Sequence, residues 1–231
     1  MLILRSDIRV DDISYKTAPI TFISINTNQK KLTANLENKL LASDVETLIL
    51  LEWNGKNIHL PTWIENGYNV SYNEKDDFTF GTLVLSKLDI TFNRIDPQVS
   101  NNCPYPILVG TYIKNNTKHF LYPIHAPPPV PYCDFSTKAY LSEVSKSFKE
   151  ISFKKDVVTL IGDFNAMQIL GMTKPLKGHQ IKDLGSVFDY TWRPFTFLPA
   201  MAKIDRAFTN YDAELSRFKV EGSDHYGLLV Y

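Results

Sequence analysis

Several features that mark specialised classes of protein are scarce in this sequence. Its 231 residues include only two cysteines, Cys103 and Cys133. They supply neither a metal-binding cluster nor a disulfide framework. A single disulfide bridge between them stays an open alternative, so the cysteines do not indicate whether the compartment is oxidising or reducing. No apolar run approaches the roughly 20 residues needed to span a bilayer, and Met1–Leu4 is too short for the core of a signal peptide. We therefore expect a soluble chain, cytoplasmic if the sequence is complete and membrane-associated or exported if an N-terminal segment was removed.

A surplus of charge of either sign is also missing. The 25 lysines and arginines balance the 25 aspartates and glutamates, which gives a formal net charge of +0. Proteins that hold nucleic acid mainly by neutralising its phosphates usually carry a basic surplus. The composition therefore disfavours strong, sequence-independent binding of DNA, while a local basic patch stays open.

What the chain does contain is enough apolar material for a full core. Hydrophobic residues make up 44% of it and aromatic residues 13%. The sequence has no low-complexity tract, no repeat and no shift in composition that resembles a linker. The length alone fits one large domain or two small ones. We expect a single domain over residues 1–231, with residues 1–19 as an N-terminal extension, and a monomer.

Strand-like and helix-like segments alternate along the chain. Apolar residues spaced by three and four predict helices over Lys31–Ser43 and Ala139–Phe148. Apolar, β-branched runs predict strands over Ile20–Ile25, Thr47–Leu51, Phe78–Leu85, Asp89–Phe92, Ile107–Ile113, His119–Ile124, Val157–Ile161, Lys203–Thr209 and Gly227–Tyr231. Pro127–Pro129 offers no donors to a sheet, so it predicts a rigid loop. Strands and helices mixed in this way favour an α/β domain with mixed sheets flanked by helices.

Polar residues stand where the apolar strands stop or start. Five such places carry Asn26, Glu52, His125, Asp163 with Asn165, and Asp224 with His225. Taken singly, most have an ordinary structural interpretation: a turn former for Asn26, a solvated acid for Glu52 and a satisfied imidazole for His125. Asp224 likewise fits an Asx-type turn. A functional interpretation therefore depends on their combination.

The stretch Gly162–Asn165 (GDFN) is harder to explain by structure alone. A glycine and the polar residues Asp163 and Asn165 follow the mostly apolar Val157–Ile161, which is an unusual end for a core strand. Because side chains on a strand alternate between faces, we expect Asp163 and Asn165 to point to one side and Phe164 to turn into the packing. We expect Gly162 to let the backbone come close to the site.

Motifs of this kind follow one another along the whole chain. They are SIN ending at Asn26, LLE ending at Glu52, GTLVLS over Gly81–Ser86, GDFNA, the pair Thr191–Trp192, KID ending at Asp205 and GSDH ending at His225. In this order they resemble the endonuclease/exonuclease/phosphatase superfamily, the deoxyribonuclease I-like group. GDFN and SDH at this separation make the signal specific, and the resemblance runs from about Ile20 to Tyr231. The prolines after His125 are most similar to a bacterial branch with a His-x-Pro-Pro-Pro motif.

The resemblance implies a fold and a reaction. The fold is an α/β (α+β) four-layer α/β/β/α sandwich of two mixed, mostly antiparallel sheets with helices outside. The reaction is metal-dependent hydrolysis of a phosphate ester by a phosphodiesterase, nuclease or phosphatase. Nucleic acid, a phosphoinositide, a sphingolipid or another phosphodiester would be the partner. The alternative is a catalytically inactive binding or scaffold module of the same fold, which the complete set of acid, amide and histidine residues disfavours.

The resemblance also implies a metal site. Glu52 is the expected first ligand, supported by Asn26 and Asp224. An oxygen-rich set without a thiolate suits Mg²⁺, with Mn²⁺ as the alternative ion. Leu51 stands before Glu52 where many family members have Gln, so we expect the local support of Glu52 to differ.

Five further residues take catalytic roles by the same resemblance. Asp163 activates the attacking water, and Asn165 donates hydrogen bonds to the phosphate. Asp205 orients the ring of His225, and His125 acts as the general acid.

Three charged residues near these motifs have open roles. Asp183 fits either an extra acid of the site or a helix cap, and we favour the helix cap. Arg193 and Lys203 flank the expected site and suit a phosphate, although exposed cations are usually only solvated.

Overall fold

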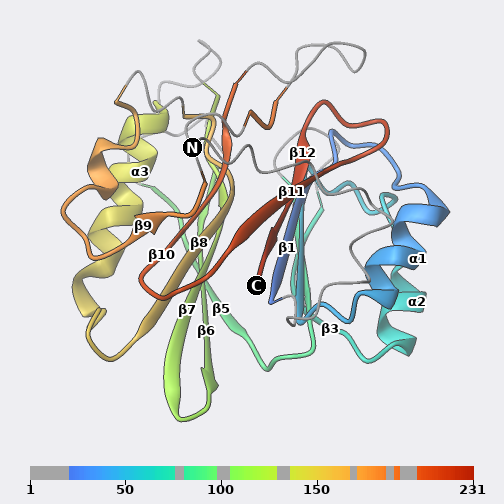
Figure 1. The fold of residues 1–231 in the computed structure, drawn as a ribbon, viewed down its shortest axis with the longest axis horizontal. Coiled ribbons are helices and arrows are strands. Elements are labelled where there is room, and N and C mark those ends of the chain that lie inside the picture. The colour runs from blue at the N-terminus through green and yellow to red at the C-terminus, as the bar shows by residue number, and fades with distance from the viewer. Residues whose placement is uncertain are drawn as a thin grey trace, which may run out of the picture. The chain divides into compact units, whose positions relative to one another are not determined.

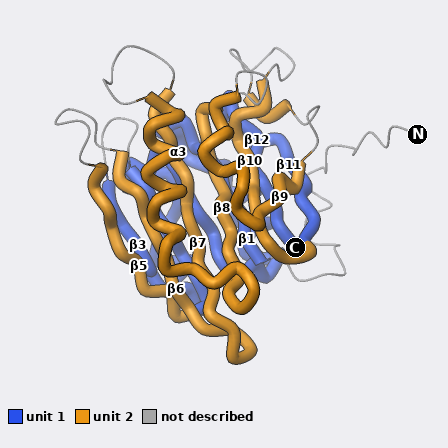
Figure 2. The backbone as a smooth tube through the Cα atoms, turned by 90° about the vertical axis from the view of Figure 1, so that its left-hand side faces the viewer, with its two compact units in different colours: residues 1–88, 193–200, 213–231 blue, residues 89–192, 201–212 orange. Residues whose placement is uncertain are grey.

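The computed structural model describes residues 21–75, 81–97, 105–128, 136–166, 171–185, 190–192 and 202–231 (Figure 1). Cys103, Cys133 and Arg193 lie outside these residues, as does the expected extension 1–19. The described residues form two compact units (Figure 2). Unit 1 takes those up to Leu88 and from Ala213 onward, and unit 2 takes those between Asp89 and Asp212. Among the described residues, none of the helices combines the length and apolar character required to cross a bilayer.

Unit 1 is built on a six-stranded sheet with the strand order β11-β12-β1-β2-β4-β3. Its strands are β1 (Phe22–Asn26), β2 (Thr47–Leu51), β3 (Asn69–Glu74), β4 (Thr82–Ser86), β11 (Leu215–Lys219) and β12 (Tyr226–Val230). β1 and β2 run parallel, and the other neighbours are antiparallel. Every residue of β1, β2 and β4 is buried, the polar ones included, as suits strands in the interior of a sheet.

Two helices, α1 (Ala34–Ala42) and α2 (Leu60–Glu65), pack on the unit 1 sheet. The Thr33 hydroxyl caps α1 by accepting from the backbone N–H of Leu36. Trp63 of α2 is fully buried and donates from its ring nitrogen to the Glu37 carboxylate of α1 at 2.8 Å. Burying such an aromatic side chain stabilises the fold by roughly 1.5–3 kcal/mol.

Unit 2 holds a second six-stranded sheet, with the order β5-β6-β7-β8-β10-β9. Its strands are β5 (Thr91–Ile95), β6 (Ile107–Lys114), β7 (Thr117–His125), β8 (Val157–Asp163), β9 (Lys182–Asp183) and β10 (Asp205–Thr209). β7 and β8 run parallel, and the remaining pairs are antiparallel. Two short 3-10 turns, η2 (Ser147–Glu150) and η4 (Lys174–Leu176), complete the unit.

The helix α3 (Thr137–Lys146) makes the crossover between β7 and β8. Ser136 caps it by accepting from the backbone N–H of Ala139. Its buried residues include Tyr140 and Val144. Directly after the helix, Phe148 meets the ring of Tyr122 on β7 edge-on, with centroids 5.4 Å apart. A parallel strand pair needs such a crossover, and the helix supplies the apolar cover for the sheet.

The expected α/β fold with two mixed, mostly antiparallel sheets and accompanying helices is confirmed. The strand over Thr47–Leu51 has the predicted bounds, and the predicted helix Lys31–Ser43 contains α1. The helix α2 and the strands β3, β9 and β11 were not predicted. The helix is only six residues long, and the three strands are partly exposed, with polar residues that break the apolar pattern.

One parallel strand pair in each sheet determines where the predicted site residues lie. Asn26 ends β1, beside the last residue of β2, so Glu52 follows at the same sheet edge. In the other sheet, His125 at the end of β7 is in register with Asp163 at the end of β8. β10 is antiparallel to β8 and therefore begins at this same edge, with Asp205. The residues predicted from strand ends thus gather at one edge of each sheet.

Candidate active site

Four predicted residues belong to unit 1, and we call Asn26, Glu52, Asp224 and His225 the unit 1 group. Glu52 follows β2 in a left-handed conformation with φ of 57°, which a non-glycine residue adopts only at a cost. Its carboxylate accepts a hydrogen bond of 3.0 Å from the Asn26 amide. The Thr27 hydroxyl binds the Glu52 backbone carbonyl at 3.1 Å. Hydrogen bonds to side chain and backbone therefore hold Glu52 in place.

Asn28 connects the two carboxylates of the unit 1 group. Its backbone N–H donates to the Asn26 amide oxygen at 2.9 Å, and its side-chain amide donates to Asp224 Oδ1 at 2.8 Å. The same Asp224 oxygen lies 4.0 Å from Nε2 of His225. One chain of polar contacts therefore runs from Glu52 to His225.

Ser223 ties the loop before β12 to the end of β1. Its buried hydroxyl donates to the Asn26 carbonyl at 2.8 Å and accepts from the His225 backbone N–H at 3.0 Å. This is the Asx-like turn that the SDH triplet suggested, but with serine as the turn-forming side chain. The turn fixes the backbone from which Asp224 and His225 project.

The donor atoms of the unit 1 group fit a hard divalent cation. The carboxylates of Glu52 and Asp224 and the amide oxygen of Asn26 are all oxygen donors, and Glu52 and Asp224 are only partly buried. Mg²⁺ prefers oxygen ligands, uses few protein carboxylates and retains several waters. The expected set Glu52, Asn26 and Asp224 is therefore chemically consistent with such an ion.

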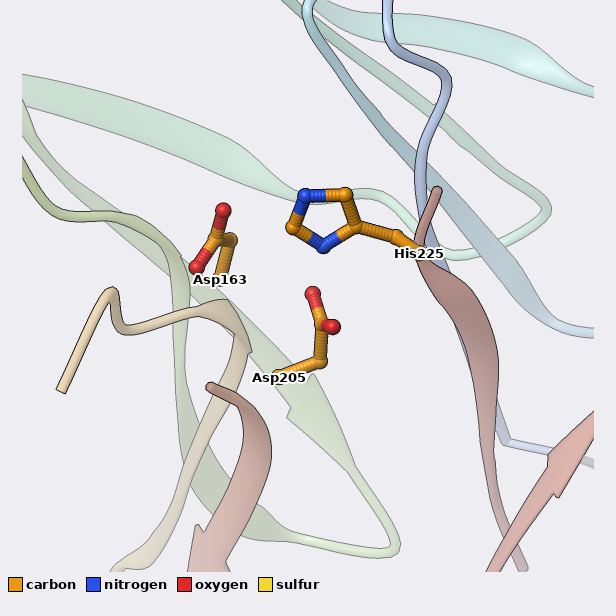
Figure 3. A group of neighbouring side chains, drawn as sticks. All are labelled: Asp163, Asp205 and His225. Carbon is orange, nitrogen blue, oxygen red and sulfur yellow. The ribbon is translucent and has the colours of Figure 1, made fainter. Parts of the chain in front are cut away.

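The other four predicted residues belong to unit 2, and we call His125, Asp163, Asn165 and Asp205 the unit 2 group. Asp163 and Asp205 are direct partners across β8 and β10, with carboxylate oxygens within 4.8 Å (Figure 3). The third side chain in that figure is His225 of the unit 1 group. Both carboxylates are buried, with exposed fractions of 2% and 3%. Two ionised carboxylates this close repel each other, so the pair favours a neighbouring positive charge.

Asp163 and Asn165 do lie together, but for a different reason than strand alternation. β8 ends at Asp163, and Asn165 has a left-handed backbone with φ of 46°. Its N–H donates to Asp163 Oδ1 at 2.8 Å, and its amide donates to Ala126 O at 2.8 Å and to Asp163 Oδ2 at 3.3 Å. Phe164 is fully buried against Phe208, as predicted. A turn therefore brings the acid and the amide together.

His125 occupies the end of β7 as a largely buried ring. It is in register with Asp163, and 8% of the residue is exposed. The ring of Tyr105 meets it nearly perpendicularly, with centroids 5.5 Å apart. The backbone N–H of the next residue, Ala126, donates to the Asp163 carbonyl at 2.9 Å. These contacts fix the imidazole at the same sheet edge as the two carboxylates.

Thr191, part of the Thr-Trp pair in the sequence, supports the start of β10. Its buried hydroxyl accepts from the backbone N–H groups of Ile204 at 3.2 Å and of Asp205 at 2.9 Å. Buried N–H groups that lack a partner cost free energy. Thr191 therefore positions Asp205 through the backbone, a role that the sequence motif alone did not assign.

The expected helix-cap role of Asp183 is wrong. Asp183 lies in β9 and forms ion pairs with Lys203 at 3.1 Å and with Arg206 at 2.8 Å. Burial lowers the pKa of the Arg206 guanidinium, and the neighbouring Asp183 charge counteracts this shift. Lys203 is likewise buried and paired, so the picture of an exposed, solvated cation does not apply to it. The three charges fasten the start of β10 to β9.

This chain resembles a known family in its sequence pattern and several solved structures in its fold. The sequence pattern of the Endonuclease/Exonuclease/phosphatase family matches residues 25–225. The chain belongs to this family. Its members are hydrolytic nucleases and phosphatases that depend on divalent metal ions, so this family member is of the metal-dependent phosphoesterase and nuclease class. A comparison with the sequences of curated proteins finds no match.

Several solved structures of other proteins share the fold. A truncated TDP2 of Caenorhabditis elegans has a TM-score of 0.68 at 16% identity, covering 91% of this chain and 96% of that one. TDP2 of D. rerio in complex with a single strand DNA product has a TM-score of 0.65 at 15% identity, covering 91% and 97%. An AP endonuclease of Archaeoglobus fulgidus has a TM-score of 0.64 at 12% identity, covering 92% and 98%. These likenesses show that the chain has the predicted deoxyribonuclease I-like fold.

Proposed function

We propose that this family member is a Mg²⁺-dependent phosphodiesterase that hydrolyses its substrate with a water activated by Asp163. The observation that carries the proposal is the Asp163 carboxylate, buried at the end of β8 and oriented by two hydrogen bonds from Asn165. A carboxylate fixed in this way can accept a proton without first reorganising. The match of one family pattern across both units supports a single functional domain.

Glu52, Asn26 and Asp224 are the residues we assign to the metal ion. Asn26 donates to one oxygen of the Glu52 carboxylate, and Asn28 donates to one oxygen of the Asp224 carboxylate. A Mg²⁺ ion held there would withdraw charge from a phosphoryl oxygen of the substrate, and Mn²⁺ would do the same. Other residues of the chain transfer the protons and orient the phosphate in this proposal.

Asn165 is the residue we assign to the phosphate. Its amide donates a short bond to the carbonyl of Ala126 and a longer one, of 3.3 Å, to Asp163. The longer bond is the weaker of the two, so a phosphate oxygen can take its place while the Ala126 bond keeps the side chain oriented. A donor of this kind stabilises charge that develops on the phosphoryl oxygens.

The remaining residues move or hold protons in this proposal. We assign Asp205 the role of orienting the ring of His225 during the reaction, and His225 that of facing the phosphate. His125 protonates the leaving oxygen. Its largely buried ring, held by Tyr105, suits a group that must donate along one direction.

The proposed substrate is a phosphodiester, with single-stranded nucleic acid as the first candidate. The D. rerio TDP2 structure holds a single strand DNA product, which supports nucleic acid ahead of phosphoinositides and sphingolipids. We propose that the protein acts as a monomer.

The decisive test is Asp163→Asn. We expect metal-dependent hydrolysis to fall by roughly two to four powers of ten, because the amide cannot take the proton of the attacking water. The fold should be retained, since an amide oxygen still accepts from the Asn165 N–H. Mg²⁺-dependent cleavage should be measured on single-stranded DNA, plasmid DNA, RNA, a phosphoinositide and sphingomyelin.

Asp156→Asn is the matched control, because it makes the same change just before the other end of β8. We expect its turnover to equal that of the wild type. Wild-type turnover in a folded Asp163→Asn variant would refute the assignment. Inactivity of the wild type on all five substrates, with no binding of Mg²⁺, would favour a binding or scaffold module of the same fold.

A further inference from the structure

Asn57 is a fully buried polar residue in the loop between β2 and α2. Its amide nitrogen donates to the Thr27 hydroxyl and to the carbonyl of Lys30, both at 2.8 Å. Its amide oxygen accepts from the backbone N–H of Asn54 at 2.9 Å, and its own carbonyl accepts from Leu32 at 2.8 Å. Asn57 therefore joins the loop after β1 to the loop after β2.

The bond from Asn57 to Thr27 leads directly to Glu52. The Thr27 hydroxyl accepts from Asn57 and donates to the carbonyls of Leu51 and Glu52, at 3.0 and 3.1 Å. The Thr27 backbone N–H also donates to Leu51 O at 3.1 Å. A relay of hydrogen bonds thus connects a buried amide to the backbone of the residue assigned to the metal.

The same relay holds the residues next to Thr27, which orient side chains of the unit 1 group. Thr27 stands between Asn26 and Asn28, which hold the carboxylates of Glu52 and Asp224. Asn28, Gln29 and Glu52 all have left-handed backbone angles, with φ of 47, 56 and 57°. Non-glycine residues adopt this region at a cost, so surrounding contacts must maintain it. Asn57 and Thr27 supply such contacts.

We infer that Asn57, acting through Thr27, is a positioning residue for the metal ligands Glu52, Asn26 and Asp224. The inference rests on the metal site of the proposed function. Burying an amide costs free energy unless all its hydrogen bonds are made, and here the amide makes them to two loops at once. The polar relay fixes a geometry, which an apolar side chain of similar size would not do.

The test compares metal binding with stability in three variants. Asn57→Ala removes the whole link, and Thr27→Val removes only the hydroxyl relay while keeping the side-chain shape. Thr47→Val is the matched control, because it deletes a buried hydroxyl that bonds Ser86 at 2.8 Å at the opposite end of β2. The affinity for Mn²⁺ should be measured by calorimetric titration of the full chain, well below the Tm of each variant.

We expect the Kd for Mn²⁺ to rise by about 10- to 100-fold in Asn57→Ala and Thr27→Val, the range for residues that support metal ligands. In Thr47→Val the Tm should fall while the Kd stays at the wild-type value. Thr27→Ser, which keeps the hydroxyl, should restore most of the affinity lost in Thr27→Val.

Two results would overturn different statements. A lower Tm with an unchanged Kd in both Asn57→Ala and Thr27→Val would make the relay a purely structural link and refute the inference. A wild-type protein that binds no Mn²⁺ would instead refute the metal site of the proposed function.

Discussion

At the scale of single residues, amide side chains link the residues of the unit 1 group by hydrogen bonds. Asn26 donates to Glu52 and accepts from Asn28, and Asn28 in turn donates to Asp224. A carboxylate only accepts, whereas an amide both donates and accepts. The amides therefore orient two carboxylates while leaving their charge for a cation.

Glu52→Gln tests the charge at this position. The glutamine oxygen can still accept from Asn26, so the fold and the loop geometry should persist. Loss of the negative charge should raise the Mg²⁺ concentration for half-maximal activity by about 10- to 100-fold, with activity recovering at high Mg²⁺. A Mg²⁺ titration of the rate measures this shift. Glu46→Gln, just before the other end of β2, serves as the control, and an unchanged titration in Glu52→Gln would contradict the assignment.

The candidate residues differ in how far the sequence predicts them. Asp163 and Glu52 are predictable because each breaks an apolar strand at its end. Asn57, Ser223 and Thr191 are not, because they act through hydrogen bonds to the backbone of segments that are distant in sequence. No periodic pattern marks such contacts, so they emerge only from the folded chain.

At the scale of elements, the parallel strands β7 and β8 approach each other closely at a glycine. Gly162 of β8 is in register with Ile124 of β7 and has φ of 139°. A Cβ atom there would lie 2.2 Å from the Ile124 carbonyl oxygen. In the structure, Gly162 lets the two strands that carry His125 and Asp163 approach each other.

Gly162→Ala should therefore destabilise the protein strongly. Backbone strain and the clash each cost about 1–3 kcal/mol, which lowers the Tm by roughly 5 to 20 °C in a chain of this size. Thermal unfolding followed by circular dichroism measures the change. Gly178→Ala is the control, because Gly178 also has a positive φ, of 99°, but no atom within 4 Å of its Cβ position. Equal Tm losses in the two variants would refute the role of the clash.

The elements that the sequence predicts well are the buried ones. β1, β2 and β8 are mostly apolar and rich in β-branched residues, and α1 and α3 have apolar residues at helical spacing. β3 instead has exposed or partly exposed residues throughout, and α2 has only six residues. Both are stabilised by their neighbours in the fold, which local sequence does not encode.

Buried tyrosines link the stability of the whole molecule to pH. Burial raises the pKa of Tyr68 in unit 1 and of Tyr122 and Tyr140 in unit 2, that of Tyr122 to about 12. A hydrogen bond with Ser147 partly opposes the shift in Tyr122. The unfolded chain, with tyrosine pKa values near 10, therefore loses protons first as the pH rises.

We expect the free energy of unfolding to fall as the pH rises from about 10 towards 12, because the unfolded state then binds fewer protons than the folded state. Tyr122 alone should contribute roughly 3 kcal/mol of this loss, and Tyr122→Phe should remove that share. Absorbance of tyrosinate at 295 nm, recorded with circular dichroism, measures the coupling. Complete tyrosine titration near pH 10 with native circular dichroism would contradict the prediction.

The family and the fold are predictable from the sequence, whereas the substrate is not. The motifs mark strand ends along nearly the whole chain, and these ends carry the residues that we assign to the phosphate and the metal ion. Every candidate substrate contains that phosphate, so the same groups serve all of them. Selectivity depends on surfaces that contact the rest of the substrate.

The sheet of unit 1 contains strands from both ends of the chain, since β1 pairs with β12, Phe22 opposite Val230. On a ribosome, β1 leaves the exit tunnel long before β12, and all of unit 2 is translated between them. The backbone groups of β1 that pair with β12 therefore stay without this partner throughout that interval, and its apolar residues Ile23 and Ile25 lack part of their packing. Nascent chains arrested within unit 2 should be the ones most prone to aggregate and most dependent on chaperones.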